Sequence, residues 1–182
     1  MFIRKYLYSN ICNNSMTKKI IFHEKQKFRQ PWIWIGLFAF LLIQLYGLVQ
    51  QIFFNIPFGN KPASNLTFII IFILYIGLMF LFKIINLNVE IREDIYIRFY
   101  PLQKSFTKIS IKDIKKYYIR TYNPIVDYGG WGIRYGLRSR GLVYNVSGNK
   151  GVQLELFNGK LILIGSQNSE KLKNAIESIK KN

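Results

Sequence analysis

Cysteine and histidine are almost absent from this 182-residue chain, which has one of each, Cys12 and His23. A single cysteine excludes an internal disulfide and a multi-cysteine metal site. A single histidine excludes the histidine clusters on which zinc sites rely. The chain also has no P-loop and no GxSxG nucleophile motif. We therefore expect no bound cofactor and no metal site.

Acidic residues are scarce as well: nine Asp and Glu stand against 26 Lys and Arg, which gives a formal net charge of +17. Those in the expected strands and turns are scattered, at Glu90, Glu93, Asp94, Asp113, Asp127 and Glu155. General acid–base catalysis needs groups placed together, and this spacing predicts no catalytic pair. We expect that the protein is not an enzyme and has no catalytic residues.

Two long apolar runs, residues 31–54 and 66–85, are each long enough to cross a bilayer as a helix. The segment between them, residues 55–65, is short and rich in proline and asparagine, which is typical of a turn. A loop this short requires the two helices to run antiparallel. The sequence thus predicts a two-helix transmembrane hairpin.

The distribution of basic residues predicts the orientation of this hairpin. Residues 1–30 form a basic tail with seven Lys and Arg against Glu24, whereas the loop has Lys61 alone. The positive-inside rule then places both termini in the cytoplasm and the loop outside, in a multi-pass protein of the cytoplasmic (inner) membrane. The tail has no apolar core and no small-residue cleavage site, so we do not expect it to be a signal peptide. Met16 offers a second start, which leaves open whether residues 1–15 are native.

Gln44 lies near the middle of the first run, where an unpaired amide in hydrocarbon is unfavourable. We expect it to form an intramembrane helix contact, either with the second helix or with another chain.

From residue 86 onward the hydrophobic pattern changes to the period of two that is typical of strands. It predicts four strands, of which the first two, residues 86–92 and 95–100, form a hairpin. A long glycine-rich crossover over residues 126–141 and three more strands ending at Ile164 follow. The apolar residues that follow have the spacing of one buried helical face: Leu172, Ala175, Ile176 and Ile179. This spacing predicts a helix over residues 168–181. Residues 86–182 are therefore expected to form an antiparallel cytoplasmic domain capped by a C-terminal α-helix.

The order of these elements is that of a pleckstrin-homology (PH) fold, in which a helix plugs one corner between two sheets. The chain also resembles bacterial membrane proteins of uncharacterised function that have two spans and a cytoplasmic PH-like domain. The segments that carry the resemblance are FRQPWIW (28–34), YNPIVDYGGWGIRYG (122–136), YNVSGNKGVQLELFNGKLILIGSQ (144–167) and the final helix. The resemblance implies a membrane α+β protein with a PH-like β-sandwich or barrel of about seven strands. It implies no function, because one fold hosts many ligands.

The crossover contains the candidate contact surface. Arginines there alternate with aromatic residues, and a lysine from a later turn is a candidate neighbour; the set is Trp131, Arg134, Tyr135, Arg138, Arg140 and Lys150. The three arginines share parity, so an extended segment would place them on one face. Such a mixture favours anionic lipid headgroups or an acidic partner. The alternative is a structural crossover on a domain that is basic throughout, with 18 Lys and Arg against eight acids from Lys83 to Asn182.

The leading functional hypothesis is an integral membrane protein that presents a PH-like binding or scaffold module at the cytoplasmic membrane face. The alternative is an accessory subunit of a membrane transport or export complex. The partners expected are the bilayer, with its anionic headgroups, and either a membrane protein or a second copy of this chain. Nucleic acid is not expected, because tethering to a membrane favours other partners for the same charge.

Overall fold

The computed structural model describes residues 19–136 and 140–181. The chain divides into two compact units, one formed by Lys27–Ile85 and the other by the described residues up to Gln26 together with those from Asn86 onward. The first is a helical hairpin and the second contains the sheets and the C-terminal helix.

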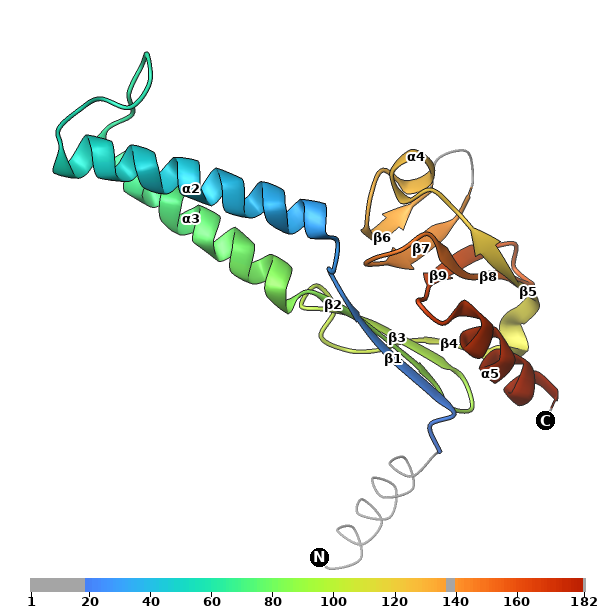
Figure 1. Cartoon of the computed structure of the whole chain (residues 1–182). Helices are drawn as coiled ribbons and strands as arrows, with labels where there is room; N and C mark the ends of the chain where they lie inside the picture. Colours follow the sequence, from blue (N-terminus) through green and yellow to red (C-terminus); the bar gives the residue numbers. More distant parts are fainter. Residues whose placement is uncertain (1–18, 137–139, 182) are drawn as a thin grey trace, which may run out of the picture. The chain divides into compact units, whose positions relative to one another are not determined.

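The hairpin consists of helices α2 (Pro31–Phe53) and α3 (Asn65–Ile84), which lie side by side (Figure 1). Both are long and apolar enough to cross a membrane. Pro31 occupies the first turn, where its missing N–H costs no hydrogen bond. Ser64 caps α3, because its hydroxyl accepts a hydrogen bond from the Thr67 N–H at 3.2 Å.

Close packing and a few polar contacts hold the two helices together. Gly47 lets two rings pack closely against α2, since a Cβ there would lie 2.8 Å from Phe58 and 2.9 Å from Phe68. The Tyr75 hydroxyl donates to the Leu37 carbonyl at 2.6 Å. A carbonyl inside a helix can accept this second bond, which satisfies the phenol hydroxyl between the two apolar helices.

The second unit contains two separate sheets. The first has four strands in the order β1-β2-β3-β4: β1 (Phe22–Lys27), β2 (Asn86–Ile91), β3 (Ile95–Tyr100) and β4 (Thr107–Ile109). A 3-10 turn, η1 (Ile111–Asp113), leads from β4 to the second sheet. The alternating pattern of residues 86–100 thus gives the hairpin that the sequence predicts, with Asn86 paired to Tyr100 and Ile91 to Ile95.

The second sheet has five strands in the order β5-β8-β9-β7-β6. Its elements, with the short helix α4, are β5 (Ile114–Thr121), α4 (Pro124–Tyr128), β6 (Gly132–Tyr135), β7 (Leu142–Asn145), β8 (Lys150–Leu156) and β9 (Leu161–Gly165). Strands β7 and β9 run parallel, and the other pairs are antiparallel. The prediction of a wholly antiparallel domain is wrong at this pair, and the two sheets do not close into a barrel.

Helix α5 (Ser169–Lys181) follows β9 and contacts β5, β8 and η1. Leu172 and Ile176 are fully buried on its inner face, as the i, i+4 spacing predicts. They join the fully buried aliphatic side chains of the two sheets, Leu87, Val89, Ile91, Ile95, Ile97, Ile114, Val152, Leu154 and Ile164. Apolar burial at strand and helix periodicity therefore accounts for the core of this unit.

Strand β1 is the main difference from the organisation that the sequence predicts. Residues 22–27 were expected within a basic tail, but they form an edge strand of the first sheet. Ile21, just before β1, donates its N–H to the carbonyl of Ile91 at the end of β2, so β1 and β2 run antiparallel. The chain therefore enters the hairpin from one strand of a sheet and returns from it into the neighbouring strand.

Candidate functional site

The crossover between β5 and β7 is more ordered than the sequence indicates, because it contains α4 and β6. Asn123 caps α4 by accepting hydrogen bonds from the N–H groups of Ile125 and Val126 at 3.1 and 3.2 Å. The helix ends at Gly129, which has φ of 70°, a left-handed conformation that glycine adopts without strain. Gly129 therefore serves the turn that leads from α4 toward β6.

The predicted contact residues of the crossover are partly engaged with the protein itself. Arg134 on β6 donates from Nε to the Trp131 carbonyl at 2.9 Å. Arg140 forms an ion pair with Asp127 of α4, which ties the segment before β7 to the short helix. Arg138 lies outside the described residues. Arg140 is thus less available to a ligand than the sequence implies, because its charge already has a partner.

The structure does not gather the remaining candidates on one face. Arg134 and Tyr135 are neighbours on β6 and so point to opposite sides of the sheet. Lys150 is exposed at the start of β8, and two strands, β9 and β7, lie between β8 and β6. The single six-residue surface that the sequence suggests is therefore divided, with Tyr135 belonging to a different feature.

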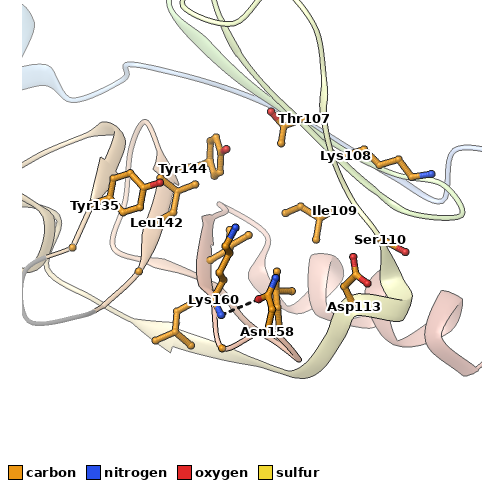
Figure 2. Close-up of a pocket in the computed structure, with 16 residues that line it drawn as sticks. Thr107, Lys108, Ile109, Ser110, Asp113, Tyr135, Leu142, Tyr144, Asn158 and Lys160 are labelled. Atoms are coloured by element: carbon orange, nitrogen blue, oxygen red, sulfur yellow. Dashed lines mark hydrogen bonds between the residues drawn. The ribbon is translucent and has the colours of Figure 1, made fainter.

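That feature is a cavity of about 540 Å³ between the edge strand β4 of the first sheet and strands β6, β7 and β9 of the second (Figure 2). The turn between β8 and β9 closes one side of it. The aliphatic side chains that line it are Ile109, Leu142, Leu156, Leu161 and Ile162, and the polar ones are Thr107, Lys108, Ser110, Asp113, Tyr135, Tyr144, Asn158 and Lys160. Its volume and its mixture of apolar walls and few polar groups are those of small-molecule sites.

Three side chains present polar atoms that the described part of the chain leaves without partners. Tyr144 is only 4% exposed, yet its hydroxyl makes no hydrogen bond to a described residue. Tyr135 is 80% exposed at the cavity edge, and Lys160 forms no ion pair within the described ranges. Figure 2 shows the phenol of Tyr144 and the side chain of Lys160 extending into the cavity. Two phenols and one ammonium together offer hydrogen-bond donors to an anion.

The other cation of the cavity, Lys108, is already paired with Asp94 at 2.8 Å. Burial alone would raise the pKa of the Asp94 carboxyl, but the Lys108 ammonium and the Ile111 N–H, at 2.9 Å, outweigh it and lower that pKa. This pair holds β4 and η1 against the β2–β3 turn. Lys108 therefore has a structural role, and Lys160 is the available cation.

The chain belongs to a family of unknown function, DUF6141. The family model matches residues 14–181, which include β1, both long helices, both sheets and α5. No curated protein and no solved structure matches the chain.

Sequence reasoning did not single out Tyr144 or Lys160. Tyr144 belongs to an alternating run that reads as an ordinary strand, and Lys160 follows the Asn158-Gly159 turn, where an exposed lysine is common. Their chemical interest depends on the proximity of β4, which the local pattern does not encode. Gln44 is partly buried on α2, and its Oε1 atom is buried and accepts no hydrogen bond from the described residues. The helix contact expected of Gln44 stays a prediction.

Proposed function

We propose that this chain is an integral membrane protein whose helices α2 and α3 cross the bilayer and whose second unit is a PH-like binding module at the cytoplasmic face. The outer surfaces of the helices support the first part. No residue of α3 is buried, and its side chains are almost all aliphatic or aromatic. Large apolar side chains exposed along a whole helix are unfavourable in water and favourable in hydrocarbon.

The observation that carries the proposal is the insertion of the helical hairpin between adjacent antiparallel strands. Strand β1 ends at Lys27 and α2 begins at Pro31, while α3 ends at Ile84 and β2 begins at Asn86. Three linking residues span at most about 10 Å. If the helices cross the bilayer, two short links tether the second unit to the membrane. A binding module tethered in this way stays close to the ligands that a membrane supplies.

The PH-like assignment rests on the order of the elements. Strands β1 to β4 form one sheet, β5, β8 and β9 are consecutive neighbours in the other, and α5 follows. A PH fold has seven strands and a C-terminal helix in this order. The helical hairpin is then an insertion between β1 and β2, and α4, β6 and β7 are an insertion between β5 and β8. Both insertions extend the domain without interrupting the pairing of its sheets.

The basic charge of the second unit favours the same location. The part of this unit from Asn86 to Asn182 has 17 Lys and Arg against eight Asp and Glu, nine more basic than acidic residues, and is attracted to an anionic leaflet. Each well-placed Lys or Arg contributes roughly 1 kcal/mol near such a surface. Arg134 and Lys150 are exposed and have no acidic partner in the described part of the chain.

Membrane fractionation tests the proposal with a matched variant. In the variant, a four-residue glycine–serine loop replaces residues 28–85 and joins β1 to β2, which the antiparallel pairing permits. We expect the full chain to stay in the membrane after carbonate washing and the variant to be soluble with its β-sheet circular dichroism retained. A reporter fused after Asn182 should be active only in the cytoplasm. Release of the full chain by carbonate, or activity of the reporter outside, would contradict the proposal.

An accessory subunit of a transport or export complex is the second candidate, and Gln44 is the observation that favours it. A buried amide oxygen without a donor is unfavourable in a hydrocarbon span, and a helix from another protein would supply one. Stoichiometric copurification with a protein that has further spans, lost in Gln44→Leu, would favour this reading.

A further inference from the structure

We propose that the cavity between β4 and strands β6, β7 and β9 binds one anionic single-chain lipid. Its acyl chain would follow the aliphatic wall and its charged head would meet Lys160, Tyr144 and Tyr135. The inference rests on the proposed function, because the adjacent bilayer supplies such molecules. It goes further in naming the ligand class and the residues that hold it.

The apolar part of the cavity suits a hydrocarbon chain. Ile109 on β4 and Leu156 at the end of β8 are buried, while Leu142 and Ile162 pair across β7 and β9 and remain partly exposed to the cavity. The wall thus combines side chains from both sheets. A ligand that covers it removes apolar surface from water, which is favourable.

The polar part of the cavity suits an anion at one end only. Tyr144 is nine-tenths buried with an unpartnered hydroxyl among the described residues, and Lys160 has no acidic partner there. Toward η1 the charges are Lys108, already neutralised by Asp94, and the exposed carboxylate of Asp113. An anionic head is therefore favoured beside Lys160 and disfavoured beside Asp113.

The size of the cavity favours one chain. At about 540 Å³ it lies in the middle of the range of roughly 300 to 1,000 Å³ that small-molecule sites occupy. The β8–β9 turn and β4 bound the space on two sides, as Figure 2 shows.

The test uses the full chain in phosphatidylcholine nanodiscs and three ligands with the same oleoyl chain. Oleate and oleoyl lysophosphatidic acid carry an anionic carboxylate or phosphate, and monoolein carries no charge. Native mass spectrometry counts the bound molecules, and a photoactivatable oleate maps the site by peptide sequencing. We expect one saturable anionic ligand, crosslinks within residues 107–113 or 142–162, and about tenfold weaker binding of monoolein. The two anionic arms show which head the site prefers.

Three variants separate the parts of the site. Lys160→Gln should weaken binding of the anionic ligands roughly tenfold and leave monoolein unchanged, because it removes one charge-assisted contact. Tyr144→Phe should weaken them about fivefold with the fold intact, since only a hydroxyl is lost. Ile162→Trp should block all three ligands by filling the cavity. Lys171→Gln, which makes the same change of charge on the exposed face of α5, should have no effect.

Equal ligand binding by the wild type, Tyr144→Phe and Lys160→Gln would overturn the proposal, as would crosslinks confined to the helices. A peptide mass retained by the purified protein and lost in Ile162→Trp would overturn it too, in favour of a protein partner. Insertion is measured separately by carbonate washing of the same membranes. Loss of ligand binding in an inserted protein therefore contradicts the lipid site alone, and release from the membrane contradicts the proposed function.

Discussion

Strand β1 and helix α5 flank the two sheets at opposite ends of the described chain, and they are docked by different forces. Helix α5 buries Leu172 and Ile176 completely in the aliphatic core. Strand β1 instead buries Glu24 and Gln26, which are 8% and 3% exposed. The Glu24 carboxylate accepts hydrogen bonds from the Ser166 hydroxyl at 2.5 Å and the Gln167 N–H at 2.8 Å, and Gln26 donates to the Gly165 carbonyl at 2.7 Å.

This difference shows how a polar edge strand is held in place. Apolar docking depends on area and tolerates changes of shape, whereas polar docking depends on particular donors and acceptors. The bonds of β1 reach from the first sheet to the end of β9, about 140 residues along the chain. Because α2 follows β1 after only three residues, these bonds also fix the strand from which the hairpin begins.

The largest expected effect comes from disrupting the apolar docking of α5. Ile176→Asp places a charge in the core, and we expect it to lower the free energy of unfolding by at least about 4 kcal/mol. Limited proteolysis of the full chain in detergent, with urea, measures the loss. Asn174→Asp adds the same charge at an exposed position of α5 and should change stability little. Full protease resistance in Ile176→Asp would show that α5 is not docked through this face.

Disrupting the polar docking of β1 should have a smaller and more local effect. Glu24→Ala leaves the Ser166 hydroxyl and the Gln167 N–H without an acceptor, which we expect to cost about 3 kcal/mol. Hydrogen exchange should quicken at the Gln167 amide before it changes in α5. Lys25→Ala, on the exposed face of β1, is the control and should stay within about 0.5 kcal/mol of the wild type. Unchanged exchange at Gln167 in Glu24→Ala would mean that the Glu24 carboxylate does not dock β1.

The smallest expected effect concerns pH. The stability that a carboxylate such as Asp94 contributes depends on pH, whereas the stability that buried aliphatic side chains contribute does not. The pKa of Asp94 is lowered in the folded state, so its stabilising contribution is complete above the unfolded value of about 3.9 and is lost as pH falls through the folded value. We expect Asp94→Asn to cost about 1 kcal/mol at neutral pH and nothing in strong acid. Unfolding of both proteins at several pH values measures this; Glu170→Gln, on the exposed first turn of α5, should show no such convergence. A difference that persists in acid would assign the effect to packing rather than charge.

The same contrast explains which elements could be predicted. The strands from residue 86 to 100 and helix α5 were predicted within a residue or two, because their buried faces are apolar and periodic. Strand β1 was missed because its buried face carries Glu24 and Gln26, which read as part of a charged tail. The crossover was expected to lack regular structure, and its α4 and β6 are too short to produce a periodic signal.

The residues of the candidate surface could be chosen from the sequence, but their arrangement in space could not be predicted. Arg134, Arg140 and Tyr135 are close in sequence, and shared parity suggested one face for the arginines. The fold instead pairs Arg140 with Asp127 and turns Tyr135 toward the cavity. No local pattern encodes these outcomes, because they depend on how α4 and β4 lie against the second sheet.

The sequence by itself determined the two long apolar helices, the position of most strands and the buried face of α5. Each of these follows from the hydrophobic content and periodicity of one continuous segment of the sequence. Only the tertiary structure decided that β1 joins the first sheet, that β7 lies parallel to β9, and that Tyr144 and Lys160 share a cavity with β4. These features join segments far apart in the chain through polar contacts and strand order, and neither of these has a period that can be read along the sequence.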